Sequence, residues 1–92
     1  MSTISISNVQ FQASNQEDRD SGFVGWVSLT INGAIEVDGI AVRRTATGRR
    51  ALSFPSRKDA NGQQHFFLRP LSDQARRDIE HQVFSALGME VT

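Results

Sequence analysis

Basic side chains are the residues of this sequence whose types and spacing indicate chemistry. Residues 53–59 read SFPSRKD, so Arg57 and Lys58 follow directly after an apolar run that stops at Pro55. Residues 43–77 contain nine basic residues, and eight of them are arginine. The planar guanidinium of arginine donates two parallel hydrogen bonds to a phosphate or a carboxylate and also stacks on flat rings. The predicted chemistry is therefore the binding of anions.

The charges are unevenly distributed along the 92-residue chain, although its formal net charge is zero. Residues 1–42 carry one basic and five acidic residues, whereas residues 43–77 carry nine basic and two acidic residues. If folding gathers the basic residues, the protein has a positive surface despite its overall neutrality. A solvated surface of mixed charge is the alternative, and the sequence alone leaves both open.

Several of the basic residues form pairs at the ends of expected strands or in the first turns of an expected helix. Because adjacent residues of a strand face opposite sides, at most half of a pair within a strand joins one surface. Basic residues in loops, among them Arg57 and Lys58, are freest to follow a phosphate backbone. The candidate nucleic-acid-binding residues are Arg44, Arg49, Arg50, Arg57, Lys58, Arg76 and Arg77.

Residues suited to catalysis or metal binding are scarce. The chain has two histidines, expected in different elements, and no cysteine. A nucleophile-elbow motif and a glycine-rich phosphate loop are also absent from the sequence. We therefore expect no enzyme activity, no metal or other cofactor, and no small-molecule substrate.

The sequence gives no indication of export or membrane insertion. Its first ten residues lack a basic start followed by an apolar stretch, and no apolar run approaches the length that spans a bilayer. The lack of cysteine fits a reducing compartment. We expect a cytoplasmic protein without a membrane partner.

The alternation of polar and apolar residues predicts the strands that position the basic residues. The Asn-Gly pair at 32–33 is typical of a tight hairpin, because both turn positions need positive φ. Changes of phase near Asn8 and Gly39 indicate bulges. Residues 14–21 and 56–63 are expected to be loops. The expected strands are residues 4–11, 23–31, 35–42, 50–54 and 65–68.

A C-terminal helix follows, with Ser72 as its N-cap and Gly88 as its C-terminal stop. Its apolar stripe is suited to covering one face of the sheet, whereas Phe84 is expected to face away. The stripe comprises Ala75, Ile79, Val83, Ala86 and Leu87. The predicted fold is a single α+β domain over residues 1–92, in which the helix packs on an antiparallel sheet of about five short strands. Because so small a core is marginal, we also expect a homodimer.

Aromatic side chains offer a second way to hold nucleic acid, by stacking on exposed nucleobases. Phe54, Phe66 and Phe67 lie closest in sequence to the basic residues. Because Phe66 and Phe67 face opposite ways, one of them is expected in the core. Phe23 is expected on the core face of its strand. Trp26 is expected on the opposite face, where it covers a second layer or a partner subunit.

Four stretches of the sequence occur in a familiar order. They are IEVDGIAVRR at 35–44, RRALSFPSRKDANG at 49–62, HFFLRPLS at 65–72 and ARRDIEHQVFSAL at 75–87. In this order they resemble the SpoVG family (stage V sporulation protein G), the septation and sporulation regulators of bacteria. The likeness extends over residues 4–87, and its most specific part is the Phe-Pro-Ser-basic-basic motif at 54–58.

The resemblance implies a small dimeric regulator that binds DNA or RNA and has no catalytic activity. It also implies that the basic residues after the Pro-Ser step and those of the helix contact the nucleic acid. In this chain these positions are Arg57 and Lys58, with Arg76 and Arg77 as the helical counterparts.

A second interpretation of the basic residues stays open. Arginine binds carboxylates as well as phosphates, so the same residues suit an acidic surface of a partner protein. An exposed strand edge or Phe84 would then supply the apolar anchor. The two interpretations differ in whether DNA or RNA binds with a dependence on salt.

Overall fold

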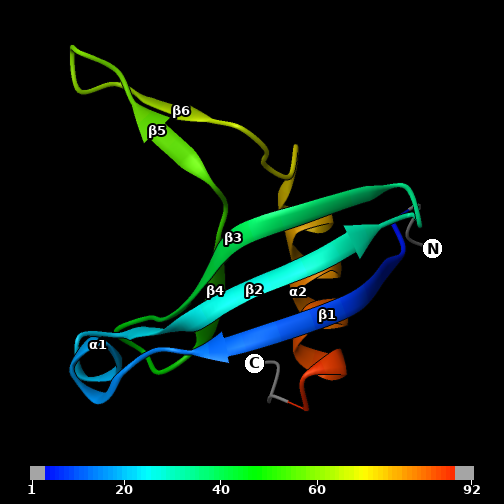
Figure 1. Cartoon of the computed structure of the whole chain (residues 1–92), viewed down its shortest axis with the longest axis horizontal. Coiled ribbons are helices and arrows are strands. Elements are labelled where there is room, and N and C mark those ends of the chain that lie inside the picture. The colour runs from blue at the N-terminus through cyan, green and yellow to red at the C-terminus, as the bar shows by residue number, and fades with distance from the viewer. Residues whose placement is uncertain (1–3, 89–92) are drawn as a thin grey trace.

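The computed structural model describes residues 4–88, which form six strands and two helices. In chain order they are β1 (Ile6–Ala13), α1 (Gln16–Asp20), β2 (Phe23–Ile31), β3 (Ile35–Arg44), β4 (Arg50–Ser53), β5 (Ser56–Lys58), β6 (Gln64–Phe66) and α2 (Asp73–Ala86). Strands β1 to β4 form one antiparallel sheet in that order, and α2 covers one of its faces (Figure 1). This confirms the predicted α+β fold, in which a C-terminal helix packs on an antiparallel sheet.

A turn and two bulges shape the long strands. Asn32 and Gly33, with φ angles of 53° and 65°, form the predicted turn between β2 and β3. The pairing of β1 with β2 shifts around Asn8, whose φ is 50°. The pairing of β2 with β3 shifts where Gly39, at a φ of 77°, adds a residue to β3. Both bulges that the phase changes predict are therefore confirmed.

A further irregularity, at the start of β2, changes the face of the sheet to which its first residues point. The pairing of β2 with β3 shifts between Phe23 and Gly25. The ring of Phe23 meets that of Trp26 with centroids 4.8 Å apart, and Arg43 lies over the Phe23 ring. Val24 instead packs against the core. The prediction that Phe23 faces the core is wrong, because it assumed uninterrupted alternation along the strand.

The core lies between the sheet and α2. Its buried residues come from β2, β3, β4 and α2, and they are Val27, Leu29, Val37, Ile40, Val42, Leu52, Ile79, Val83 and Phe84. Phe84 is only 1% exposed, so the prediction that it faces away from the core is wrong, and Ala86 is exposed instead. Adjacent helix residues are about 100° apart, and an apolar stripe wide enough for both Val83 and Phe84 is common on helices that cover a sheet.

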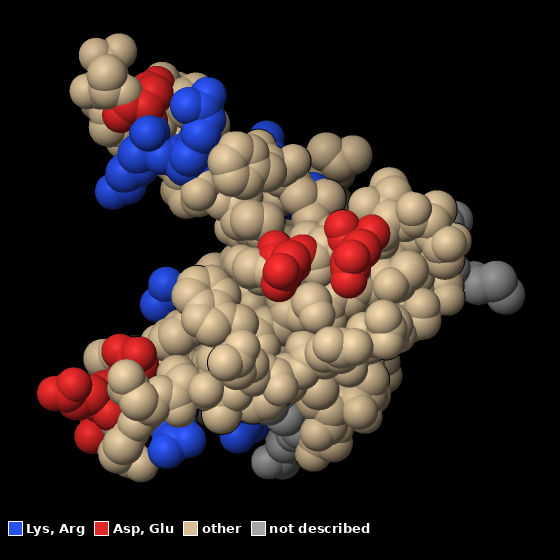
Figure 2. All heavy atoms as spheres, in the orientation of Figure 1, with Lys and Arg blue, Asp and Glu red and all other residues tan. Residues whose placement is uncertain are grey.

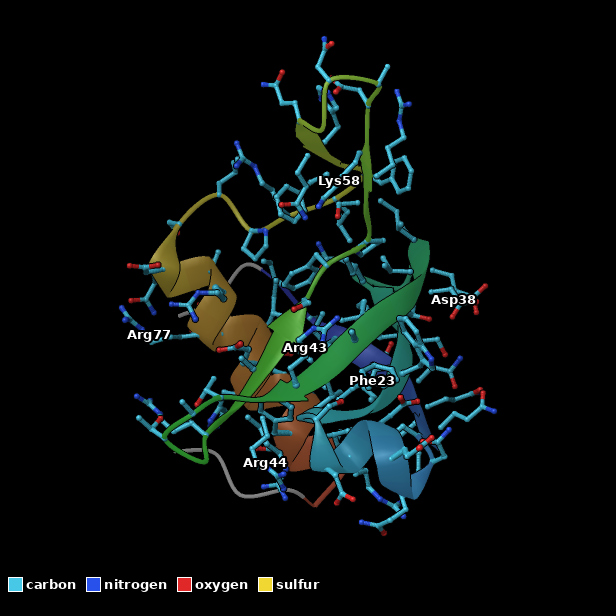
Figure 3. The ribbon with its side chains drawn as sticks, turned by 90° about the vertical axis from the view of Figure 1, so that its left-hand side faces the viewer. Phe23, Asp38, Arg43, Arg44, Lys58 and Arg77 are labelled. Carbon is cyan, nitrogen blue, oxygen red and sulfur yellow. The ribbon has the colours of Figure 1, made fainter. Side chains whose placement is uncertain are left out.

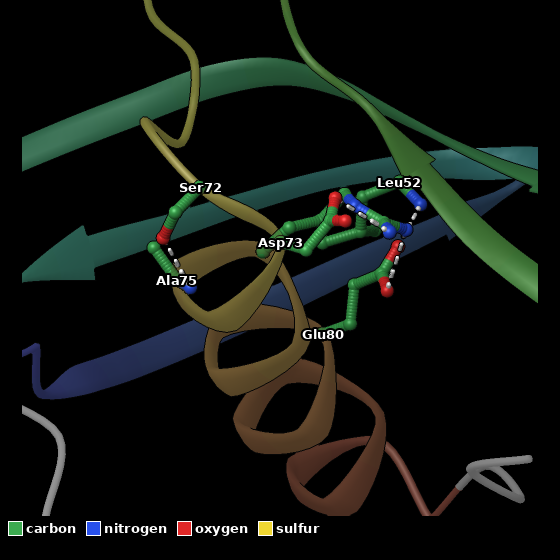
Figure 4. Close-up of polar contacts among 6 residues, drawn as sticks. Leu52, Ser72, Asp73, Ala75 and Glu80 are labelled. Carbon is green, nitrogen blue, oxygen red and sulfur yellow. Dashed lines mark hydrogen bonds and ion pairs between the residues drawn. The ribbon is translucent and has the colours of Figure 1, made fainter.

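Two polar side chains of α2 fasten the helix to both edges of the sheet. Glu80 Oε2 accepts a hydrogen bond of 3.0 Å from the amide of Leu52 in the edge strand β4 (Figure 4). At the other edge, Gln82 accepts from the amide of Ile6 and donates to the carbonyl of Ile4, each at 2.9 Å. The helix therefore has a fixed orientation on the sheet, which sets the directions of the basic residues in its first turns.

Both helices begin at a side-chain cap. The Oγ of Ser72 accepts from the amide of Ala75 at 3.1 Å, as predicted (Figure 4). Asn15 Oδ1 accepts from the amide of Asp18 at 2.8 Å and starts α1, so the prediction of a loop over residues 14–21 is wrong there. The sequence signal was weak because α1 buries none of its residues. Neither of the helices within residues 4–88 has the length and apolar content needed to cross a bilayer.

Strands β5 and β6 form a separate hairpin that projects from the main sheet (Figure 1). We call residues 55–67 the arm. Across the arm, Ser56 pairs with Phe66 and Lys58 pairs with Gln64. Arg57 and Lys58, the two basic residues that follow the Pro-Ser step, therefore both belong to strand β5.

The base of the arm is closed by a hydrogen bond of 3.0 Å from the amide of Phe67 to the carbonyl of Pro55. The structure corrects two expectations in this region, a loop over residues 56–63 and a strand over residues 65–68. Strands of three residues are too short to show an alternating pattern, and that is why the sequence did not reveal the hairpin.

Candidate nucleic-acid interface

Arg57 and Lys58 lie on β5, and both are exposed. As neighbours in a strand they face opposite sides of the arm, with Arg57 across from His65 and Lys58 across from Gln64. Within residues 4–88, neither forms an ion pair with a carboxylate. Both positive charges are therefore available to an external anion.

Asp59 organises the tip of the arm directly after these two residues. Its Oδ1 accepts hydrogen bonds from the amides of Asn61 at 2.9 Å and Gln63 at 3.0 Å, and its Oδ2 lies 2.8 Å from Nε2 of His65. The hydrogen bond with His65, followed by those from Gln63 and Asn61, lowers the pKa of Asp59 below its ordinary value. The carboxylate thus holds the turn that fixes the direction of β5 and its basic residues.

Four of the other predicted residues converge where the turn between β3 and β4 meets the start of α2. Arg49 and Arg50 come from the turn and the first position of β4, and Arg76 and Arg77 come from the first turns of α2. Together they line an open depression of about 370 Å³. We call these four residues the arginine depression. Folding therefore brings Arg49 and Arg50 to the same depression as Arg76 and Arg77, although β5 and β6 separate the two pairs in the sequence.

Carboxylates hold one member of the arginine depression in place. Arg76 Nη2 lies 3.3 Å from Asp73 Oδ1, and Arg76 Nη1 lies 3.7 Å from Glu80 Oε1. Because Glu80 also binds the amide of Leu52, the Arg76 guanidinium is tied to β4 (Figure 4). Partly exposed pairs of this kind add little stability, but they position the guanidinium.

A larger hollow separates the arm from the sheet face that α2 leaves uncovered (Figure 2). Its volume is about 820 Å³, and we call it the arm groove. Trp26 and Arg43 line it from the sheet, and Phe66 and Arg69 line it from the arm and the segment that follows. Arg76 lines both the arm groove and the arginine depression, so the two are adjacent.

Arg43 and Arg69 are two basic residues of this surface that the sequence-based selection missed. For Arg43 a signal existed, because its neighbour Val42 is buried and alternation then directs Arg43 to the open face. For Arg69, which follows the last strand, the pattern of residues gave no direction.

Arg44, in contrast, is a predicted residue that the structure does not bring to the others. Its Nη2 donates to the carbonyl oxygen of Arg19 at 3.1 Å, at the end of α1. It lines neither the arm groove nor the arginine depression. Figure 3 shows Lys58, Arg43 and Arg77 on the arm, the sheet and the helix, and Arg44 at the end of the molecule opposite the arm.

Phe66 and Phe67 are both exposed, at 43% and 68%. The expectation that one of them lies in the core is therefore wrong, because the arm projects away from the core. Phe66 lines the arm groove, whereas Phe67 does not. Phe54 is partly buried against the core and is less accessible for stacking.

Two groups of acidic residues lie away from the arginine depression, whereas Asp59, Asp73 and Glu80 lie beside basic residues of this surface. Figure 2 shows positive side chains on the arm with a negative one beside them, and further negative ones around α1 and in the middle of the open sheet face. The acidic residues of these two regions are Glu17, Asp18 and Asp20 on α1, and Glu36 and Asp38 on β3. The acidic residues of α1 and β3 thus do not line the arginine depression, whereas Glu80 lines it and pairs with Arg76.

The described part of the chain contains no group of three His, Cys, Asp or Glu side chains that could hold a metal ion. Comparison of the chain with protein-family models and with curated proteins finds no match.

Proposed function

We propose that this protein is a non-enzymatic regulator that binds DNA or RNA through the arm and the arginine depression. The observation that carries the proposal is the gathering of Arg49, Arg50, Arg76 and Arg77 at one place, next to a groove that leads to the arm. The resemblance to the SpoVG family supports the regulatory role, and the lack of cysteine supports a cytoplasmic location.

Phosphate groups suit this surface because they recur along a backbone at regular intervals. Arg57 and Lys58 project from opposite sides of the arm, and the arginine depression offers further guanidinium groups beyond the groove. A ligand with one charge would meet only one of these groups. A polyanion meets several at once, and each neutralised phosphate releases counterions and adds to the affinity.

Sequence preference is expected to be modest. The helix α2 uses Ile79, Val83 and Phe84 to pack on the sheet, and Glu80 and Gln82 to bind its edges. It does not stand clear of the protein in the way that a recognition helix enters a major groove. Contacts with phosphates position a protein on nucleic acid, but they read no sequence.

We also propose that the protein acts as a homodimer. Exposed apolar side chains support this part of the proposal, since Ile35 and Leu71 are 59% and 95% exposed. Association that covers them would add buried apolar area to a small core. The molar mass in solution, measured by light scattering across a range of protein concentrations, tests this; a monomer throughout the range contradicts it.

An acidic protein partner is the competing candidate for the arginines. Its aromatic anchor, Phe84, lies in the core and cannot make that contact. The edge strand β4 remains as an anchor for an acidic partner, although its Leu52 amide already donates a hydrogen bond to Glu80.

Fluorescence anisotropy with labelled single-stranded and duplex DNA and RNA tests the proposal. The double variant Arg57→Ala, Lys58→Ala is expected to bind at least tenfold more weakly than the natural protein, because two phosphate contacts are lost. Arg19→Ala is the control, since it removes a positive charge from the acidic helix α1. Absence of binding to all four nucleic acids would overturn the proposal, and so would equal losses in the double variant and the control.

A further inference from the structure

Two large aromatic side chains line the arm groove from different elements and remain open to solvent. Trp26 projects from the uncovered face of the sheet and is 47% exposed, and Phe66 lies on the arm and is 43% exposed. Two exposed aromatic side chains in one groove, here of about 820 Å³, are unusual in a protein unless a ligand covers them.

Each ring is held in place by a neighbour. The Phe23 ring meets Trp26 edge to face, with centroids 4.8 Å apart and planes at 68°. The Arg43 guanidinium carbon lies 5.6 Å from the Phe23 centroid, and that of Arg69 lies 5.9 Å from the Phe66 centroid. Phe66 therefore has an arginine over its ring, and Trp26 packs against Phe23, which in turn lies under Arg43. These neighbours restrict the side chains before any ligand arrives.

The charges that surround the rings are those a phosphodiester would meet. Arg43, Arg69 and Arg76 all line the arm groove. Lys58 lies on the same side of the arm as Ser56 and Phe66, because residues two apart in a strand share a face. A flat ring next to a phosphate-binding guanidinium matches the alternation of nucleobase and phosphate along a single strand.

A duplex does not offer the same fit. Its nucleobases present only their edges, since their faces are stacked inside the helix. Unpaired nucleobases expose both faces, and every kind of base stacks on an aromatic ring. The volume of the groove, about 820 Å³, is also large enough for a nucleotide and lies within the range of about 300 to 1,000 Å³ seen for ligand sites.

We infer that the arm groove is a stacking site for unpaired nucleobases, with Trp26 and Phe66 as stacking platforms and Arg43 and Arg69 as phosphate contacts. This inference rests on the proposed function and makes its substrate class more specific. The protein then prefers single-stranded DNA or RNA, or unpaired loops, to a continuous duplex. The arginine depression, by comparison, contacts backbone of either kind.

Trp26 provides a direct readout because it is the only tryptophan of the chain. The experiment is a titration of the natural protein with single-stranded oligothymidylate of about 12 nucleotides, and with the same strand paired to its complement. Stacking on Trp26 is expected to quench its fluorescence strongly with the single strand and weakly with the duplex. The single strand is also expected to bind at least tenfold more tightly.

Variants assign the effect to the groove. Phe66→Ala is expected to weaken binding of the single strand about tenfold and to leave duplex binding within twofold. Phe67→Ala is the matched control, because Phe67 is exposed beside Phe66 but does not line the groove. Trp26→Phe is expected to retain most of the affinity that Trp26→Ala loses. Circular dichroism establishes that each variant is folded.

Three results would overturn the inference. Duplex binding without Trp26 quenching, with Phe66→Ala no weaker than Phe67→Ala, removes the stacking site and leaves the proposed function standing. If the protein binds neither the single strand nor the duplex, the result contradicts both the stacking site and the proposed function. A blue shift of Trp26 emission with rising protein concentration, in the absence of nucleic acid, assigns the groove to a second copy of the chain.

Discussion

Asp38 places a carboxylate beside the aromatic floor of the arm groove. It lines a small pocket on the open sheet face together with Trp26, and its Oδ1 accepts a hydrogen bond of 2.8 Å from the amide of Gly39. The carboxylate therefore repels any phosphate that approaches Trp26. At a separation of several ångströms in water such a repulsion is about 0.5 kcal/mol.

Asp38→Asn is accordingly expected to tighten binding of single-stranded DNA by about twofold at low salt. Asparagine keeps the side-chain oxygen that the Gly39 amide needs, so the bulge is preserved. Asp20→Asn removes the same charge from α1 and is the control. Anisotropy titrations of both variants check this prediction, and weaker binding by Asp38→Asn would show that the carboxylate assists the ligand.

At the scale of single residues, it was easier to predict whether a side chain is exposed than to predict the face of the sheet to which it points. Arg57 and Lys58 are exposed, as their position after Pro55 indicated. Arg44 was selected and Arg43 was not, although Arg43 is the one that lines the groove. The alternation of β3 after the bulge at Gly39 already separates the two, because Val42 is buried and its neighbour Arg43 therefore faces the open side.

Glu80 joins two elements, and its loss should be felt in stability. It accepts from the amide of Leu52 in β4 and lies 3.7 Å from Arg76, and its side chain is only 12% exposed. Glu80→Ala leaves the amide at the sheet edge without its partner. We expect the free energy of unfolding to fall by about 1 to 3 kcal/mol.

Chemical denaturation measures this loss. Glu80→Gln keeps an oxygen that can accept from Leu52 and is expected to lose less than half as much. Glu17→Ala, on the exposed helix α1, is the control for removal of an acidic residue. If Glu80→Ala is as stable as Glu17→Ala, the bond to β4 does not anchor α2.

The arm should respond to acid separately from the core. The lowered pKa of Asp59 means that its ionised form is stabilised in the folded arm. The stabilisation is fully present above the ordinary pKa of an unfolded aspartate and is lost as the pH falls through the lower pKa of the folded arm. We therefore expect the amides of Asn61 and Gln63 to lose protection at a pH below about 4.

Hydrogen exchange followed by NMR checks this prediction, with the amides of β2 as the internal control. Asp59→Asn should show reduced protection of Asn61 and Gln63 at neutral pH and no further change on acidification. Protection of these amides that stays constant in the natural protein down to complete protonation of Asp59 would contradict the assigned role of the carboxylate.

At the scale of elements, length decided what the sequence could predict. The strands of the main sheet and α2 carry enough residues for a period to be recognised, and these predictions are confirmed. The helix α1 has five residues and the strands β5 and β6 have three each, so local caps and turns determine them instead. Phe84 was misplaced because the helix buries a wider face than the stripe suggested.

At the scale of the whole molecule, the protein separates charges that cancel in its composition. Basic residues line the groove and the adjacent arginine depression, and most acidic residues of the first half of the chain lie on α1 and in the middle of the sheet (Figure 2). Asp73 and Glu80 are exceptions, because they pair with Arg76. The sequence showed the imbalance between its parts. It could not show that Arg49, Arg50, Arg76 and Arg77 line one depression, because that depends on how α2 crosses the sheet.

The dependence of duplex DNA affinity on salt tests the central claim most directly. Six of the candidate residues, those of the arm and the arginine depression, remain after Arg44 is set aside. If they neutralise six phosphates, the logarithm of the binding constant falls with the logarithm of salt concentration at a slope of roughly −5. The double variant Arg57→Ala, Lys58→Ala should reduce the slope by about 2. A slope near zero, or one that the double variant leaves unchanged, would contradict the account.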